Sequence, residues 1–427
     1  MGAVSTERHP RLLPVQEEAR VTPIELFFDL VFVFSLTQVT TLMSPTDGLT
    51  VHTIVRGLLV LSLLWWCWVG YAWLGNVVQA EEGLGRVAMF GAMAAMFVMA
   101  VTVPEAFDDI EEGLDGPVVI AFAYLAVRFL HLAIFWMTAR TEHDRGLRTQ
   151  LLKFGPVVVA STIGLLVASQ LEGAAQTVAW AVVLVVDYVG TILGGASGWR
   201  LRSASHFAER HGLIVIVALG ESIVAIGVGI TAFPISWPII VGAVLGLAIA
   251  GCIWWAYFDV VSIVAERVLR RLRGEPRARM ARDAYSYLHL PMIAGIVLVA
   301  LGIEEVLHLV AETTDGHRTD PLELLALAAL YGGAALFLLG HVGFKWRTWG
   351  LLTFRRVIVA GLLLALIPVA AELPALGSLG LLTAVLVALI ASEAFRYAEE
   401  RERIRHEEVG PEVHGHATGA ERATPTG

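Results

Sequence analysis

Twelve long apolar runs are the feature that most constrains how this chain can fold. Each run is long enough for a helix to cross the hydrocarbon core of a bilayer, which is about 30 Å thick. Hydrophobic residues make up 56% of the sequence and charged residues 16%, whereas soluble domains are about one quarter charged. The sequence therefore predicts an all-α polytopic membrane protein. The approximate bounds of the runs are 24–43, 51–73, 86–104, 117–138, 153–171, 175–196, 211–232, 237–258, 286–310, 321–343, 352–372 and 377–397.

The basic residues lie almost entirely on alternate loops. If the chain crosses a membrane at each apolar run, 27 of the 30 Lys and Arg residues fall on one side. Arg56 and Arg318 fall on the other side, and Arg128 lies within a run. By the positive-inside rule the basic side is cytoplasmic, so we expect both termini there.

Two halves of the sequence resemble each other. Glu25 begins the first run and Glu209 lies beside the start of the seventh, and the tryptophan-rich stretch Trp65–Tyr71 has a counterpart in Gly251–Tyr257. Because six crossings return a chain to the same side, such repeats are parallel and related by an axis along the membrane normal. The predicted organisation is a cytoplasmic N-terminal tail, two six-helix repeats and a charged, disordered cytoplasmic C-terminal tail. Their bounds are 1–22, 23–200, 201–398 and 399–427.

A glutamate lies inside the seventh run. Glu221 is near the middle of the predicted membrane span, where a charge costs at least a few kcal/mol and marks a functional site by default. Ser222 belongs to a strip of small residues, with Ala218, Ala225 and Gly229, that allows another helix to approach closely. Glu221 is either a proton or cation site on an ion pathway that includes Ser222, or a protonated structural carboxyl bonded to a neighbouring helix.

Arg128 and His131 share one face of the fourth predicted helix. A buried arginine requires an acidic partner, and Asp187 and Glu221 are the candidates at comparable depth. The ion pair is either static or is broken and re-formed during transport, and Arg128 in the second case neutralises a carboxylate or meets an anionic substrate. His131 is either a core histidine or a proton relay.

Charged residues also mark the starts of the first and seventh predicted helices. Glu25 and Asp29 are four residues apart, which places them on one helix face, and Glu209, Arg210 and His211 lie at the mouth of the seventh helix. We interpret the five residues as a cytoplasmic gate. The alternative is an acidic anchor paired with loop arginines.

Other features exclude several classes of function. The sequence has no phosphate-binding glycine loop, no His-Glu-x-x-His helix and no strand–turn nucleophile, so we expect no enzymatic activity and no cofactor. Cys67 and Cys252 are too few for a zinc cluster, and we expect no metal site. A net charge of −9 argues against a nucleic-acid partner. The clustered tryptophans are expected at membrane interfaces or in packing, not in a ligand site.

The stretches Glu25–Phe34, His206–Gly212 and Leu219–Ser222 carry a family resemblance. The chain resembles the bacterial low-temperature-requirement A (LtrA) family over about residues 20–400. The resemblance implies a multi-pass protein of the bacterial cytoplasmic (inner) membrane, in a family named for growth in the cold. It implies no particular reaction or ligand.

These observations together favour a secondary transporter or permease with its site between the two halves. Glu221 and Asp187 would exchange a proton or bind a cation, and the expected partners are the lipid bilayer and an unknown small solute or ion. A homo-oligomer is compatible with the sequence. The alternatives are an ion channel, a non-transporting structural or signalling membrane protein that supports growth in the cold, and, third, an intramembrane enzyme acting on lipid.

Overall fold

A computed structural model of the 427-residue chain describes residues 15, 19–44, 48–81, 83–108, 112–230, 233–312 and 320–396. This described part is built from helices and contains no β-sheet, which confirms the predicted all-α class. The predicted C-terminal tail, 399–427, and most of the predicted N-terminal tail, 1–22, lie outside the described residues.

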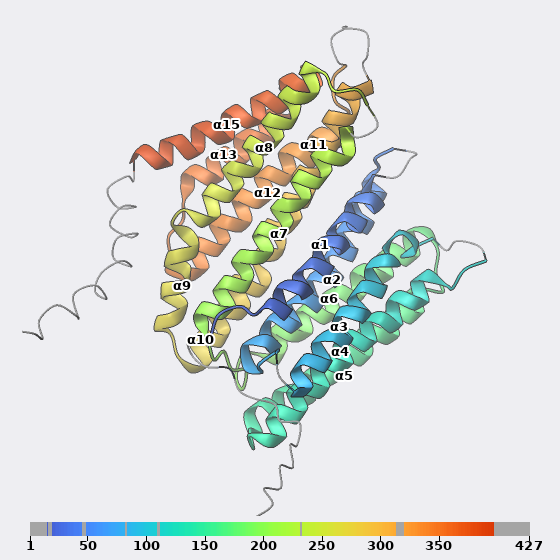
Figure 1. The fold of residues 1–427 in the computed structure, drawn as a ribbon, viewed down its shortest axis with the longest axis vertical. Coiled ribbons are helices and arrows are strands. Elements are labelled where there is room, and N and C mark those ends of the chain that lie inside the picture. Colours follow the sequence, from blue (N-terminus) through green and yellow to red (C-terminus); the bar gives the residue numbers. More distant parts are fainter. Residues whose placement is uncertain are drawn as a thin grey trace, which may run out of the picture.

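The first half of the chain forms one side of the molecule (Figure 1). Within it α1 packs against α2 and α3, and α3, α4 and α5 each pack against the next helix. A short 3₁₀ helix, η1, covers Val103–Glu105 before α4. The long helices are α1 (Pro23–Met43), α2 (Val51–Val77), α3 (Gly83–Val101), α4 (Gly116–Thr141), α5 (Arg145–Ala168) and α6 (Gly173–Gly194).

The second half forms the other side and meets the first along α1, α2 and α7 (Figure 1). Here α7 packs against α8 and α11, and α11 packs against α12. A π-helical segment, η2, leads into α11. The elements are α7 (Ala204–Ile230), α8 (Trp237–Phe258), α9 (Val261–Arg271), α10 (Gly274–Met280), η2 (Ala281–Tyr287), α11 (His289–Glu312), α12 (Leu324–Trp349), α13 (Phe354–Ala365), α14 (Ile367–Ala370) and α15 (Ala375–Arg396).

Among the described residues, 11 helical segments are long and apolar enough to cross a membrane. Each overlaps one of the predicted runs. The remaining run, 352–372, is divided at Leu366 into α13 and α14. Pro368 explains the division, because proline has no N–H to bond the preceding turn and its ring clashes with the carbonyl of that turn.

The second half is held together by a close contact between α11 and α12. A Cβ atom on Gly302 would lie 2.9 Å from the backbone nitrogen of Leu330, and one on Gly295 would lie 2.6 Å from the carbonyl oxygen of Gly333. The glycines therefore bring the two backbones into contact, as small residues do between helices in a membrane.

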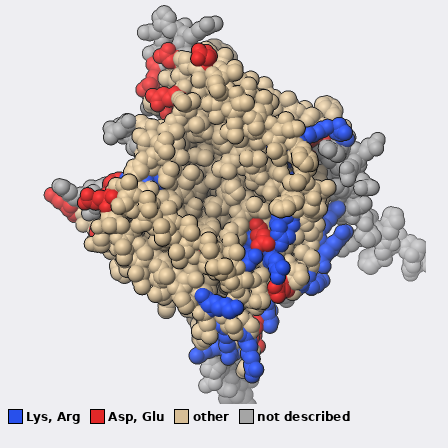
Figure 2. Space-filling view, turned by 180° about the vertical axis from the view of Figure 1, so that it is seen from behind, with Lys and Arg blue, Asp and Glu red and all other residues tan. Residues whose placement is uncertain are grey.

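The loops fall into two groups at opposite ends of the bundle. At one end, which we call the basic end, Arg200 lies 2.7 Å from Asp144 and Arg277 bonds the carbonyl of Leu201 at 3.3 Å. At the other, the acidic end, Ser44 donates a hydrogen bond to Glu305 at 2.7 Å. Figure 2 shows Lys and Arg gathered toward one end, with a few acidic residues among them, and Asp and Glu at the opposite end. This grouping agrees with the predicted alternation of loops.

Candidate functional site

Helices α1 and α7 lie side by side and run in the same direction (Figure 1). Three of the side-chain contacts that join them, spread along the length of both helices, have partners 181 residues apart. A constant offset means that the helices are parallel and in register. The contacts are Glu25–His206, Asp29–Arg210 and Thr40–Glu221.

The contact nearest the basic end joins Glu25 to His206. The Nε2 atom of His206 lies 3.0 Å from both carboxylate oxygens of Glu25, and Nδ1 lies 3.3 Å from the amide nitrogen of Asn76. Since Asn76 donates to Nδ1, the proton of the neutral ring is on Nε2 and is donated to Glu25. The Glu25 carboxylate packs against Gly75 of α2. A side chain at position 75 would clash with it, because a Cβ atom there would lie only 2.3 Å from Glu25 Oε1.

One turn further, Asp29 faces Arg210. Arg210 Nη2 lies 3.0 Å from Asp29 Oδ1, and the same oxygen accepts a hydrogen bond of 2.8 Å from the indole N–H of Trp68. The guanidinium lies over the Trp68 ring, 5.4 Å from its centroid. No nitrogen of the Arg210 guanidinium makes an aligned hydrogen bond with the described residues, although the side chain is fully buried. Charge and the indole face therefore hold this arginine in place.

Two of the predicted gate residues lie beside these pairs without joining them. Glu209 is exposed and accepts a hydrogen bond of 3.2 Å from the backbone N–H of Val21. His211 is buried, and its Nδ1 lies 2.9 Å from the carbonyl oxygen of Phe207, so this nitrogen carries the proton.

An apolar layer follows these ion pairs along both helices. Phe32 and Leu36 on α1 and Ile214 and Ala218 on α7 are all completely buried. They separate the Asp29–Arg210 pair from Glu221, so the α1–α7 contact is apolar between its two charged levels.

Beyond the apolar layer, Glu221 faces hydroxyl groups. Its two carboxyl oxygens lie 2.9 Å from the Thr37 hydroxyl and 2.8 Å from the Thr40 hydroxyl, and the residue is 1% exposed. Within the described part of the chain, no Lys, Arg or His forms an ion pair with Glu221. Ser222 is buried, and its hydroxyl has no hydrogen-bond partner among these residues.

Arg128 pairs with Asp187, one of its two predicted partners. Arg128 Nη2 lies 3.3 Å from Asp187 Oδ1, and the Tyr124 hydroxyl donates to Asp187 Oδ2 at 2.5 Å. The expectation that Asp187 and Glu221 lie at comparable depth is wrong, because Asp187 is nearer the basic end of α6 and Glu221 nearer the acidic end of α7. The structure therefore does not bring Arg128, Asp187 and Glu221 into one site.

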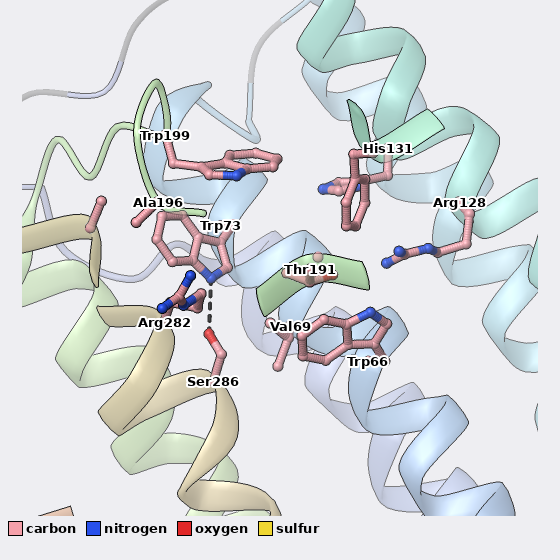
Figure 3. Close-up of a pocket in the computed structure, with 13 residues that line it drawn as sticks. Trp66, Val69, Trp73, Arg128, His131, Thr191, Ala196, Trp199, Arg282 and Ser286 are labelled. Atoms are coloured by element: carbon pink, nitrogen blue, oxygen red, sulfur yellow. Dashed lines mark hydrogen bonds between the residues drawn. The ribbon is translucent and has the colours of Figure 1, made fainter. Parts of the chain in front are cut away.

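A cavity of about 50 Å³ lies beside Arg128, between the first half and η2 (Figure 3). Residues of both halves line it, and a π-helical segment such as η2 frequently marks a functional site. Ser286 on η2 accepts hydrogen bonds of 2.9 Å from Trp73 at Oγ and from Trp65 at its carbonyl. The lining residues are Trp66, Val69, Gly70, Trp73, Arg128, His131, Phe154, Thr191, Ala196, Trp199, Ala278, Arg282 and Ser286.

Sequence reasoning missed two parts of these sites. The α2 tryptophans are buried, which agrees with the packing alternative, but their hydrogen bonds were not predicted: Trp68 bonds Asp29, and Trp65 and Trp73 bond Ser286. His206 was not predicted as a site residue, although a signal existed. His206 and Arg210 are four residues apart on α7, which is the spacing of Glu25 and Asp29 on α1.

The sequence model of a family described as bacterial low temperature requirement A protein (LtrA) matches residues 20–391, which include both contacting helices. The chain belongs to the LtrA family. A relative, an uncharacterized protein of Rhizobium meliloti (strain 1021), is 28% identical over 358 residues, which cover 80% of this chain and 81% of that protein. No solved structure matches the chain significantly. The α1 and α7 contacts thus lie in the part of the chain that the LtrA family model matches.

Proposed function

We propose that this LtrA protein is a secondary transporter of the bacterial inner membrane in which Glu221 binds the coupling proton or cation. One observation carries the proposal: a buried carboxyl on a membrane helix faces two hydroxyls and, among the described residues, no cationic side chain. An ionised carboxylate is costly at such a position, so it takes up a proton or a cation.

The hydroxyls around Glu221 fit both protonation states. The Thr40 hydroxyl is 2.8 Å from Glu221 and 2.9 Å from the carbonyl of Thr37. When Glu221 is protonated, it donates to Thr40, whose own proton then goes to the Thr37 carbonyl. When Glu221 is ionised, Thr37 and Thr40 both donate to it. Rotation of two hydroxyls therefore accommodates the gain or loss of one proton.

The pairs at the basic end support a gate between the halves. Glu25–His206 and Asp29–Arg210 both join α1 to α7, so a movement that separates these helices at the basic end breaks both contacts. The Arg210 guanidinium makes no aligned hydrogen bond with the described residues, so its separation from Asp29 would break no directional bond among them. Phe32 and Leu36 close the path behind the gate, and this occluded arrangement supports a carrier over an open channel.

The packing also supports the proposed repeat and orientation. In both halves the first helix contacts the two membrane helices that follow it, as α1 contacts α2 and α3 and α7 contacts α8 and α11. The parallel direction of α1 and α7 agrees with two parallel six-helix units, 23–200 and 201–398. By the positive-inside rule the basic end is the cytoplasmic face, and we propose that both termini lie on that side.

Proton flux in liposomes tests the proposal. The purified protein is reconstituted with a pH-sensitive dye inside the vesicles, and internal pH is followed after a step in external pH, with and without a membrane potential. We expect Glu221→Gln to abolish protein-dependent flux, because the amide retains hydrogen bonding with the two threonines and cannot be protonated in this range. Glu172→Gln, an exposed substitution at the acidic end, is the matched control and retains the flux.

A strictly coupled carrier moves protons only with its solute, so the same assay is repeated with pools of small organic and inorganic solutes inside the vesicles. If a folded Glu221→Gln variant carried proton flux at the wild-type rate, Glu221 would not be the site that binds the coupling proton or cation. Absence of flux with every solute pool, from a protein whose melting curve shows it to be folded, would favour a non-transporting membrane component.

A further inference from the structure

The cavity beside Arg128 contains hydrogen-bond donors that the ion pair with Asp187 leaves unused. The Nε–H of Arg128 and the Nε1–H of Trp66 have no partner among the described residues, although the two side chains are only 2% and 3% exposed. A buried donor without an acceptor is destabilising, because it has lost its bonds to water. Arginine and indole nitrogens only donate, so the complementary group is an acceptor.

The two charged residues that line the cavity are both arginines, Arg128 and Arg282. Arg128 lies 3.3 Å from Asp187, and Arg282 lies 2.8 Å from Asp283, a carboxylate that it shares with Arg347. Among the described residues that line the cavity there is no carboxylate. The charge at the cavity wall therefore favours an anionic ligand.

The cavity walls are mainly apolar. Trp73, Trp199, Phe154 and Val69 are among the lining residues, and the Arg128 guanidinium lies 4.9 Å from the centre of the Phe154 ring. Figure 3 shows the indole nitrogen of Trp66 and the guanidinium of Arg128 on the same side of the view, with Trp73 and Trp199 on the other. A space of about 50 Å³ accepts a few water-sized groups. A compact ligand with one anionic and one apolar end matches these walls better than a bare halide ion.

We propose that this cavity is a binding site for a small organic monocarboxylate. The carboxylate accepts hydrogen bonds from Arg128 Nε–H and Trp66 Nε1–H, and the apolar end lies against Trp73 and Trp199. Residues of both halves surround the ligand, because α2 and α4 come from the first half and η2 from the second. The site is separate from Glu221, so binding without any gradient tests it independently of the transport proposed above.

Equilibrium dialysis of radiolabelled propionate against the purified full-length protein tests this site. We expect saturable binding of one propionate per chain, with competition by butyrate and none by an equal concentration of propionamide or chloride. Trp66→Phe removes the Nε1–H and keeps an aromatic ring stacked on Tyr188, whose centroid lies 4.3 Å from that of Trp66. The loss of one hydrogen bond to a charged ligand should weaken binding about tenfold or more. Trp254→Phe, a half-exposed position on α8, is the matched control and leaves binding unchanged.

A second variant tests the cavity without changing its donors. Ala196 is a buried lining residue, and Ala196→Leu would fill the cavity and abolish binding. If melting curves show that Trp66→Phe does not fold, Ala196→Leu tests whether propionate binds in this cavity. The proposal is overturned if the wild type shows no saturable binding, if propionamide or chloride competes as well as butyrate, or if folded Trp66→Phe and Ala196→Leu bind propionate as the control does.

Discussion

Asp187 and Glu221 are both buried carboxyl groups on long apolar helices, yet their surroundings differ completely. Asp187 lies 3.3 Å from the Arg128 guanidinium and accepts a hydrogen bond from the Tyr124 hydroxyl. Glu221 is equally buried, at 1% exposure, and its hydrogen-bond partners among the described residues are Thr37 and Thr40.

This difference separates a carboxylate with a cationic partner from a carboxyl group that has hydroxyl partners among the described residues. Arg128 neutralises Asp187, so protonation of that carboxyl would leave a buried cation without a partner. Protonation of Glu221 leaves no unpaired cation among its contacts, because the threonine hydroxyls are neutral and can either donate or accept a hydrogen bond. A carboxylate paired with an arginine is therefore expected to stabilise the fold or to help bind a ligand. A carboxyl group without a cationic partner is better able to take up and release the proton that couples transport.

Removal of Arg128 should have the largest effect on stability. Arg128→Met leaves Asp187 buried and unpaired, and the loss of one member of a buried pair costs about 3–5 kcal/mol of unfolding free energy. The melting temperature of the purified protein in detergent measures this change. The double variant Arg128→Met/Asp187→Asn removes both charges and should recover most of the loss, since the carbonyl oxygen of the new amide would still accept the Tyr124 hydrogen bond.

A double variant as unstable as the single one would show that Arg128 stabilises the protein through packing, for example on the Phe154 ring, and not through Asp187. The corresponding variant at the second carboxyl group is Glu221→Gln. Since no charge is left unpaired, its unfolding free energy should differ from that of wild type by less than about 1 kcal/mol.

A second prediction concerns a variant that gives Glu221 a cationic partner. Thr37→Lys would place an ammonium group beside Glu221, because Thr37 already contacts it at 2.9 Å and is only partly buried. We expect proton flux in liposomes to fall at least tenfold with the fold retained, because the new ion pair holds Glu221 ionised. Thr41→Lys adds the same charge at an exposed position one turn along α1 and should retain flux. Equal flux in the two lysine variants would contradict a role for protonation of Glu221.

The sequence predicts much of this organisation, and the failures have physical causes. Apolar length predicts eleven of the long helices, but it does not register the break that Pro368 makes between α13 and α14. Arg128 indicated that a buried ion pair exists, whereas the choice of Asp187 depends on helix depth, which sequence spacing does not give. The cavity was not predicted, because it arises where η2 meets tryptophans that are 213 and 221 residues away in the chain.

The smallest expected effect concerns the hydroxyls around Glu221. Thr40→Val is isosteric and removes one hydroxyl that bonds Glu221 at 2.8 Å and the Thr37 carbonyl at 2.9 Å. Interhelical hydrogen bonds in membranes contribute about 0.6 kcal/mol on average, so the melting temperature should change little. Flux should fall only a few-fold, because Thr37 still donates to the ionised carboxylate. The same replacement at Thr102, whose hydroxyl bonds the Val98 carbonyl and not Glu221, serves as the control and should leave flux unchanged. If Thr40→Val abolished flux as fully as Glu221→Gln, the hydroxyl would itself be an obligatory proton carrier, and Glu221 alone would no longer account for the coupling.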